Sequence, residues 1–356
     1  MENIKTEVVK LTQFSHGGGC GCKIAPQVLE QILKTNLAMP DNKNLLVGNS
    51  SKDDAAVYDI GNEQALISTT DFFMPIVDDA FDFGRIASAN AISDVYAMGG
   101  RPVLAIAILG WPIDAIPAAV AQKVIEGSRS ICKEAGIPLA GGHTIDSKEP
   151  FFGLAVNGLV DINSFKQNNT AQIGDLLFLT KPLGVGILAT AQKRGVLNNE
   201  QLSSLVQQLT TLNKIGEALG KIEGVHAMTD VTGFGLGGHL VEMAEGSDVT
   251  AELYYSKLQI LQDAKTCLAQ NIMPGATSRN WKSYGDKILI SEQLNYKEAT
   301  SILPDPQTNG GLLIAVAEDA REQVLKLFDE YDLSKFKTPV GRIIAKAEKY
   351  INVIPG

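Results

Sequence analysis

Short apolar runs alternate with longer amphipathic segments through the first half of the chain. Short runs rich in β-branched and aromatic residues predict strands, and apolar residues that recur every three or four positions predict helices. The expected strands cover residues 55–60, 64–70, 102–110, 137–142 and 151–160, and the expected helices cover residues 83–98 and 117–136. Alternation of this kind indicates an α/β domain.

The alternation starts again after residues 161–175, a polar segment rich in Asn and Gln. Such a segment is typical of a domain boundary. The pattern beyond it predicts strands at 176–180, 226–231, 339–346 and 349–354, and helices after Gly184, at 198–222, at 239–245 and at 318–332. We therefore expect two α/β domains that join near residue 165.

The charge balance argues against two classes of partner. The 356 residues include 31 Lys and Arg against 40 Asp and Glu, which gives a formal net charge of -9. Binding to nucleic acid or to anionic lipid needs a basic surface, so neither is expected as the main partner. A small phosphate ligand held by one lysine and metal ions is compatible with this charge.

Cysteine usage and hydropathy indicate a cytoplasmic protein. Four cysteines are too few for a disulfide scaffold in a chain of this length: Cys20, Cys22, Cys132 and Cys267. The N-terminus has no apolar run of the kind that a signal peptide contains. The most apolar stretch, residues 102–121, is interrupted by Pro112, Asp114 and Pro117, so no membrane span is expected.

Residues 16–23, HGGGCGCK, form the most unusual stretch of the sequence. Small residues let backbone N–H groups converge on an anion, and Lys23 adds a point charge, although the stretch lacks the spacing of a Walker A loop. We expect the lysine and the local N–H groups to lower the pKa of a thiol here and so to favour the thiolate. Two alternatives remain open: a mobile turn with incidental thiols, and a zinc site with three ligands, His16, Cys20 and Cys22.

Five aspartates stand at strand ends or within an apolar helix: Asp53, Asp54, Asp71, Asp94 and Asp230. Asn90 and Asp94 are four residues apart and share a helix face. Each aspartate alone is compatible with a cap or a turn. Together with a phosphate-suited loop they favour Mg²⁺, which binds oxygen ligands and bridges nucleotide phosphates.

Two glycine-rich stretches are weaker signals. In residues 139–146, LAGGHTID, a strand is expected to lead into a turn whose exposed N–H groups and Thr144 hydroxyl suit a nucleotide. A surface position is the alternative for His143. Residues 233–238, GFGLGG, match G-x-G-x-x-G, but no acidic residue follows at the position that a dinucleotide fold requires, so NAD is not expected.

These motifs resemble the selenophosphate synthetase (selenide, water dikinase) family. The resemblance rests on SHGGGCGCK, DDAAVY, residues 67–100, LAGGHTID, MTDVTGFGLGGHL and DPQTNGG, in the order and spacing of the family. It covers nearly the whole chain, and the Cys-x-Cys-Lys loop is its most specific part. The wider superfamily, which includes aminoimidazole ribonucleotide synthetase, shares the Asp-rich ATP architecture without this loop. The chain departs from the pattern at HGGG and at Asn309, where relatives often carry other small residues.

The resemblance implies an α/β (α+β) fold of two domains with aminoimidazole ribonucleotide synthetase-like architecture. The expected division is a mobile Gly-rich segment at 1–50, an ATP- and Mg²⁺-binding domain at 51–165 and a C-terminal domain at 166–356. It also implies a homodimer in which the N-terminal sheets pair. The implied activity is the ATP-dependent formation of selenophosphate from selenide and water, with AMP and orthophosphate as the other products.

The site residues follow from the matching motifs. The resemblance implies Cys20 and Lys23 as catalytic residues and Mg²⁺ ligands at Asp54, Asp94 and Asp230. Nucleotide contacts are implied for Lys23, Asp54, Asp71, Asp94, Gly142, His143 and Thr144. The resemblance is also compatible with a selenium-delivery protein as a partner. Two other functions remain open: another ATP-using superfamily member, such as an amidine-forming ligase or a maturation factor, and a non-catalytic carrier that binds selenium or metal through Cys20 and Cys22.

Overall fold

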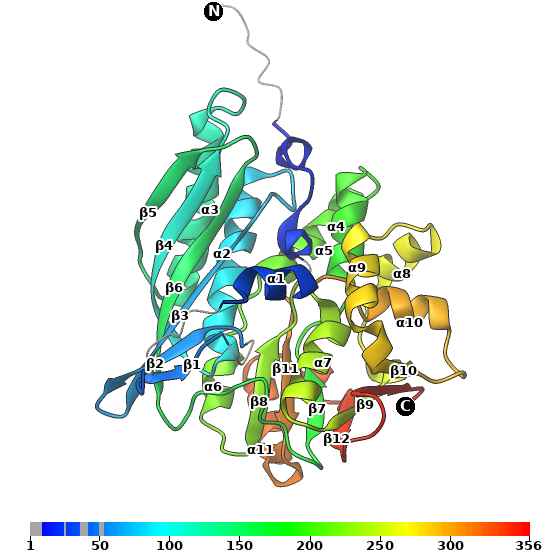
Figure 1. Cartoon of the computed structure of the whole chain (residues 1–356). Helices are drawn as coiled ribbons and strands as arrows, with labels where there is room; N and C mark the ends of the chain where they lie inside the picture. Colours follow the sequence, from blue (N-terminus) through cyan, green and yellow to red (C-terminus); the bar gives the residue numbers. More distant parts are fainter. Residues whose placement is uncertain (1–8, 25, 36–41, 50–52) are drawn as a thin grey trace, which may run out of the picture.

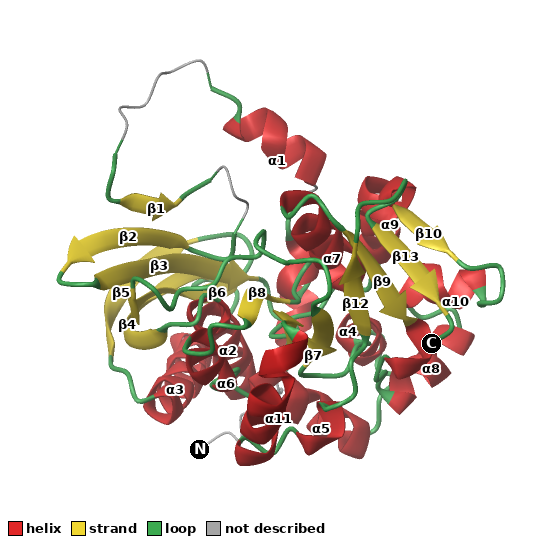
Figure 2. Ribbon diagram, turned by 90° about the horizontal axis from the view of Figure 1, so that it is seen from below, coloured by secondary structure: helices red, strands yellow, loops and turns green. Residues whose placement is uncertain are grey.

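Two mixed β-sheets form the two halves of the molecule (Figure 1 and Figure 2). The computed structural model of the chain describes residues 9–24, 26–35, 42–49 and 53–356. The first sheet has six strands in the order β1-β2-β3-β6-β4-β5, and the second has seven in the order β10-β13-β9-β12-β7-β11-β8. Neighbours in the first sheet are antiparallel except for β4 and β5, which are parallel.

The first half contains the loop with two 3-10 helices and the six-stranded sheet. Its elements are η1 (Leu11–Phe14), η2 (Gly19–Cys22), α1 (Pro26–Leu33), β1 (Leu45–Val47), β2 (Ala56–Gly61), β3 (Gln64–Phe73), α2 (Ala80–Ala97), β4 (Arg101–Trp111), α3 (Ala118–Ala135), β5 (Leu139–Asp146) and β6 (Phe151–Asp161).

The second half surrounds its sheet with short helices. Its strands are β7 (Leu176–Leu179), β8 (Val225–Asp230), β9 (Thr250–Tyr254), β10 (Ile288–Ile290), β11 (Leu312–Val316), β12 (Gly341–Ile344) and β13 (Ile351–Ile354). Its helices are α4 (Val185–Lys193), α5 (Asn199–Thr210), α6 (Ile215–Gly220), α7 (Gly235–Gly246), α8 (Gln262–Ala269), α9 (Gly275–Tyr284), α10 (Tyr296–Ile302) and α11 (Arg321–Glu330), with 3-10 helices η3 (Tyr255–Lys257), η4 (Gly285–Lys287), η5 (Glu318–Ala320) and η6 (Ser334–Phe336).

Helix α2 is the element that joins the two halves. It packs on strands β3 and β6 and on helix α3, and it also contacts α5, α6 and β8 of the second half. The Phe83 ring is fully buried and meets Phe152 edge-on at a centroid distance of 6.3 Å. The Asp79 side chain caps the helix by accepting a hydrogen bond from the Asp82 N–H. Polar side chains on α2 therefore lie in the interior between the halves.

The opposite face of the first sheet is exposed and apolar. Figure 2 shows α2 and α3 on one side of this sheet. Tyr58, Phe72, Ile106 and Ile145 on its strands are all more than a third exposed. The strand register places Phe72, Ile106 and Ile145 on the face away from the buried Ile67 and Leu154. Strand β5 forms an open edge and is exposed along most of its length.

The α/β class predicted from the sequence is confirmed. One predicted element is wrong, because the single helix expected at 198–222 is two helices, α5 and α6. The break follows from polar contacts: Thr211 is extended, and Asn213 donates to Ser93 Oγ and to the Gly310 carbonyl, both at 2.8 Å. The domain limits at 50/51 and 165/166 stay predictions, and part of the first lies outside the described residues. Within those residues, no helix has the length and apolar character needed to cross a membrane.

Candidate active site

The glycine-rich loop lies at the junction of the two halves and is bound by both. The Gly19 N–H donates to the Met74 carbonyl, and the Cys20 N–H donates to Thr308 Oγ1, each at 3.0 Å. From the second half, Lys193 Nζ donates to the Ser15 carbonyl at 2.8 Å and Arg279 donates to the Gly21 carbonyl at 3.0 Å. The loop is therefore docked against α4, α9 and the segment before β11.

Two glycines, Gly19 and Gly233, explain how the Cys20 loop comes so close to the second half of the chain. Gly19 has a φ of +57°, and a Cβ there would stand 2.6 Å from Thr308 Oγ1. A Cβ on Gly233 would stand 2.7 Å from the Cys20 carbonyl oxygen and 3.0 Å from Lys23 Cδ. Both positions need glycine, Gly19 for its backbone angle and Gly233 for contact. The first glycine of the GFGLGG stretch therefore contacts the Cys20 loop closely.

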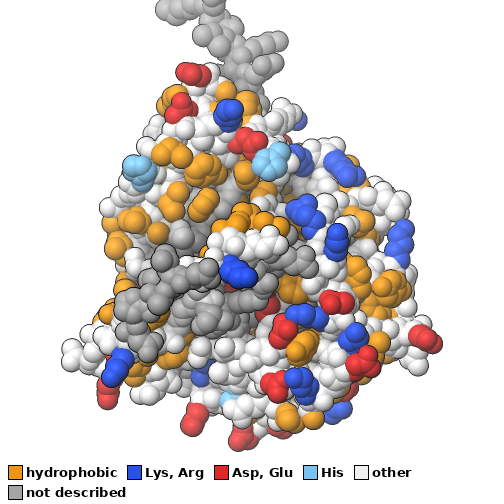
Figure 3. Space-filling view, viewed as in Figure 1, with side chains coloured by type: hydrophobic (Ala, Val, Ile, Leu, Met, Phe, Trp, Pro, Cys, Tyr) orange, Lys and Arg blue, Asp and Glu red, His pale blue; other side chains and the backbone are white. Residues whose placement is uncertain are grey.

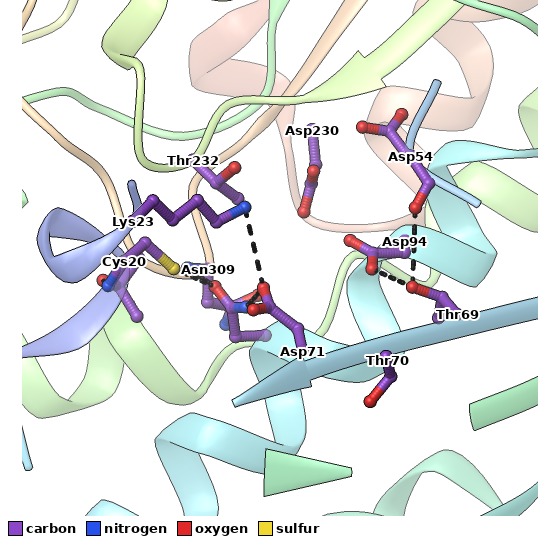
Figure 4. A network of polar contacts seen from close by, with 12 residues as sticks. Cys20, Lys23, Asp54, Thr69, Thr70, Asp71, Asp94, Asp230, Thr232 and Asn309 are labelled. Carbon is purple, nitrogen blue, oxygen red and sulfur yellow. Dashed lines mark hydrogen bonds and ion pairs between the residues drawn. The ribbon is translucent and has the colours of Figure 1, made fainter. Parts of the chain in front are cut away.

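Asn90 on α2 connects the loop to the first sheet. Its Oδ1 accepts hydrogen bonds from Cys20 Sγ at 3.2 Å and from the Asn309 N–H at 2.7 Å. Its Nδ2 donates to Asp71 Oδ2 at 2.5 Å. Lys23 Nζ lies 4.0 Å from the same carboxylate oxygen, as Figure 4 shows. One network therefore holds Cys20, Lys23 and Asp71, three of the residues predicted from the sequence.

The Cys20 thiol does not have the lowered pKa that was expected from the sequence. The residue is only 2% exposed, and burial raises the pKa of Cys20 well above its usual value. The negative charge of Asp71 raises it further, and Lys23 only partly offsets the two effects. The negative charge of Asp71 raises the pKa of Lys23, and this effect is larger than the lowering by burial. The Lys23 ammonium therefore stays charged. In this docked state the site pairs a neutral thiol with a cation.

Three aspartates from three elements face one another beside this network (Figure 4). Asp54 precedes β2, Asp94 lies on α2 and Asp230 ends β8. Thr229 Oγ1 donates to Asp54 Oδ1 at 2.9 Å, and Thr69 Oγ1 donates to Asp94 Oδ2 at 2.5 Å. The structure thus brings together the three residues predicted as Mg²⁺ ligands.

Burial and mutual repulsion dominate the titration of this carboxylate cluster (Asp54, Asp94 and Asp230). Burial, followed by the charge of Asp230, raises the pKa of both Asp54 and Asp94 well above the usual value. Burial raises the pKa of Asp230 to about 6, against a hydrogen bond from Ser93 and the charge of Lys23. Carboxylates in such surroundings gain stability when a cation is bound.

The carboxylate cluster fits a divalent metal that arrives with phosphates. Asp54 Oδ2 and Asp230 Oδ2 are buried and have no hydrogen-bond partner among the described residues. Within the same ranges, no three acidic, His or Cys side chains are gathered closely enough to hold a metal ion unaided. Mg²⁺ is commonly bound by one or two carboxylates, with water and substrate phosphates completing its shell. The orphaned oxygens suit that role.

Gly142, His143 and Thr144 do not join this site within the chain. They form part of β5, in parallel register with residues 107–109 of β4, and not the turn predicted from the sequence. Through β4 and β6, His143 is in register with Phe72, three strands away, which corresponds to roughly 14 Å. His143 also points to the sheet face opposite that of Asp71, since Asp71 and Phe72 alternate. A nucleotide contact by these residues requires a different arrangement from that in one chain.

Several contact residues were missed from the sequence. Thr308 and Asn309 hold Cys20 and Asn90, and Lys193 and Arg279 hold the loop. Thr308 and Asn309 belong to the DPQTNGG motif, but neither residue was assigned a role from the sequence. Lys193 and Arg279 resemble ordinary surface cations in the sequence, and no local signal marks them.

Comparison with known proteins places this architecture in a family. Residues 52–160 match the family described as AIR synthase related protein, N-terminal domain, and residues 172–354 match its C-terminal domain. The selenide, water dikinase of Aeromonas hydrophila is 54% identical over 347 residues, which cover 97% of this chain and 99% of that protein. The chain belongs to the selenide, water dikinase family. A member of this family from Photobacterium profundum is 57% identical over 318 residues, with 89% of this chain and 90% of the relative covered.

More distant structures share the fold. Thiamine-monophosphate kinase from Stenotrophomonas maltophilia has a TM-score of 0.62 at 22% identity, with 88% of this chain and 92% of that chain covered. Hydrogenase maturation protein HypE in complex with ATP has a TM-score of 0.60 at 17% identity, with 94% and 89% covered. The matches to the two family models, at residues 52–160 and 172–354, confirm the predicted two-domain architecture of the aminoimidazole ribonucleotide synthetase superfamily, and these structures agree with it in fold.

The close approach of Gly233 to the loop gives a test of loop docking. In Gly233→Ala the added methyl group would collide with the Cys20 carbonyl, so we expect the loop to be displaced and Cys20 to become several-fold more reactive toward iodoacetamide. Peptide mass spectrometry after timed alkylation measures this, and in the unaltered protein Cys22, which is less buried, should react before Cys20.

Gly275→Ala is the matched control for that experiment. A Cβ on Gly275 meets only Arg279 Nη1, at an ordinary 3.6 Å. Equal alkylation of Cys20 in the unaltered protein and both variants would show that the loop is not docked as described.

Proposed function

We propose that the protein makes selenophosphate from selenide and water at the expense of ATP, releasing AMP and orthophosphate. Two relatives named selenide, water dikinase align with 97% of this chain at 54% identity, which supports this activity. The observation that carries the proposal is the meeting of Cys20 and Lys23 with the carboxylate cluster at the junction of the halves. ATP and selenide are then the substrates.

The carboxylate cluster would hold Mg²⁺ through Asp54, Asp94 and Asp230. Bound Mg²⁺ neutralises the charge of the nucleotide phosphates, which is the main requirement for phosphoryl transfer. Asp230 comes from the second half of the chain and Asp54 and Asp94 come from the first. The position of the phosphates therefore depends on how the two halves are joined.

Lys23 supplies the positive charge on the loop side. Its ammonium lies beside Asp71, which keeps it protonated and orients it toward the interior. We propose that Lys23 contacts the phosphates of ATP and that Asp71 contacts the nucleotide. We also assign the docked loop a part in excluding bulk water, which would protect the reacting phosphates from wasteful hydrolysis.

Cys20 is assigned to selenium rather than to general-base chemistry. Hydrogen selenide is a strong nucleophile in its own right and needs no base to activate it. A buried Cys20 thiol with a raised pKa is poorly suited to take a proton at neutral pH, but its sulfur lies next to Lys23 and Asn90, where it can position the selenium atom. Cys22 is not part of this network.

We also propose a homodimer that buries the open face of the first sheet. Large apolar patches on a soluble protein mark interaction surfaces, and a symmetric pairing covers the same patch on both copies. Phe72, Ile106 and Ile145 on this face are each at least 40% exposed. The nucleotide contacts predicted for Gly142, His143 and Thr144 remain proposals, and in one chain these residues are on strand β5, away from the carboxylate cluster.

The assignment of Cys20 is tested against Cys22. Cys20→Ser should lose selenide-dependent AMP release and selenophosphate formation while it still binds ATP, because the serine cannot position selenium as sulfur does. Cys22→Ser should keep most of the activity. Anaerobic assays with separation of AMP and phosphorus NMR of the product measure both. A fully active Cys20→Ser enzyme would contradict this role, and an unaltered protein without selenide-dependent AMP release would contradict the proposed function.

Removal of one cluster charge should weaken metal-dependent nucleotide binding. Asp54→Asn, Asp94→Asn and Asp230→Asn each remove an anionic ligand and keep its shape, so the Mg²⁺ concentration needed for half-maximal ATP binding should rise by roughly tenfold or more. Titration calorimetry with and without EDTA checks this. Asp305→Asn is the control, because this buried carboxyl accepts hydrogen bonds from the Gly186 N–H and from Gln307 and is not part of the carboxylate cluster. If all four variants respond alike, the cluster is structural.

The dimer proposal predicts sedimentation at twice the mass of one chain. Ile106→Glu places a charge in the centre of the open face and should give a monomer. Leu289→Glu, on the exposed edge strand β10, should remain dimeric. A monomeric unaltered protein at micromolar concentration would refute the proposal.

A further inference from the structure

A cavity of about 700 Å³ lies beside the loop that carries Cys20 and Cys22. The loop contributes one wall through Gly17, Gly21 and Lys23, and helices α4 and α9 contribute the facing wall. None of the residues of the carboxylate cluster lines it. The cavity is therefore distinct from the proposed metal site, although Lys23 borders both regions.

The charged groups on the cavity wall are of one sign. Lys23, Lys193, Arg194 and Arg279 line it, and no Asp or Glu is among the residues that do. His16 also lines it and is paired with Glu149 at 2.8 Å. Figure 3 shows Lys and Arg side chains gathered over α4 and α9, on the upper right of the view. A basic cavity in a chain of net charge -9 indicates an anionic ligand.

A second, much smaller cavity lies beside Cys20 and shares part of its lining with the first. Its volume is about 10 Å³, enough for roughly one water-sized group. It is lined by Cys20 and Asn280, and it shares Gly21, Lys23 and Arg279 with the large cavity. This space is too small for a nucleotide or a phosphate ester.

We propose that the basic cavity is the entrance for selenide, and that Lys193, Arg194 and Arg279 draw in the anion before it reaches Cys20. This inference rests on the proposed function. Hydrogen selenide is a stronger acid than a thiol and is the anion HSe⁻ at neutral pH, so its charge matches the basic lining of the large cavity. A cleft lined by one sign of charge raises the local concentration and the association rate of the opposite ion.

The side chains that line the entrance have different roles. Lys193 and Arg279 donate to loop carbonyls, so they hold the loop and are kept at the cavity wall by the same bonds. Arg194 follows α4 and is exposed, and none of the hydrogen bonds that hold the loop involves its side chain. Arg194 is therefore a steering charge that can be removed without altering loop docking.

Arg194→Gln tests the entrance. We expect kcat/KM for selenide to fall by about threefold to tenfold at low ionic strength, with kcat at saturating selenide and KM for ATP unchanged. The fall should shrink as salt is added, because exposed charges are screened. Arg194→Lys keeps the charge and should restore the unaltered value. Anaerobic AMP-release assays over a series of selenide and salt concentrations provide all of these values.

Lys123→Gln is the matched control, because it removes one exposed positive charge from α3, outside the cavity. Equal kcat/KM for selenide in Arg194→Gln and Lys123→Gln would overturn the proposal, and so would a change in KM for ATP with no change for selenide. An unaltered protein without selenide-dependent AMP release would overturn the proposed function and this inference together. If the unaltered protein is active and Arg194→Gln has the same kcat/KM for selenide, the proposed entrance is wrong and the proposed function stands.

Discussion

The site depends on three carboxylates that are brought together where little water reaches them, two of them buried and one partly buried. Burial raises the pKa of all three carboxyl groups, Asp54, Asp94 and Asp230, and the charge of Asp230 raises the pKa of the other two further. Asp54 Oδ2 and Asp230 Oδ2 have no hydrogen-bond partner in the described part of the chain. Buried charges without partners destabilise a fold. Such an arrangement is retained where positive charge is supplied from outside, which is why we propose that cations and phosphates complete this site.

Helix α2 fixes the distance between the groups that this site needs. It presents Asn90 toward the loop and Asp94 toward the cluster from one face, and Ser93 accepts a hydrogen bond from Asn213 of the second half. Because the helix is buried against both halves, it cannot move without moving both groups. The relative position of the thiol and the carboxylates is therefore a property of the domain interface.

The sequence predicted the elements with strong periodicity and the aspartates at their ends, because both signals are local. It failed where distant segments decide the outcome. The Cys20 loop is held by a hydrogen bond to Thr308, 288 residues away, and burial of the docked thiol reverses the expected shift of its pKa. Gly142 suggested a turn, since glycine is uncommon in strands, but pairing with β4 makes it part of β5. The basic character of the cavity likewise comes from Lys193 and Arg279, which only the fold brings to the loop.

Loop docking and substrate access are linked by the same two side chains. Lys193 and Arg279 bind carbonyl oxygens of the loop and also line the cavity that leads to Cys20. The docked loop places a neutral thiol and a charged lysine between the basic cavity and the acidic cluster. An anion that enters from the basic side therefore meets Cys20 and Lys23 before it meets carboxylates that would repel it. In the proposed reaction this order would bring selenide to Cys20 before it reaches the phosphates, and exclusion of bulk water would protect ATP from hydrolysis.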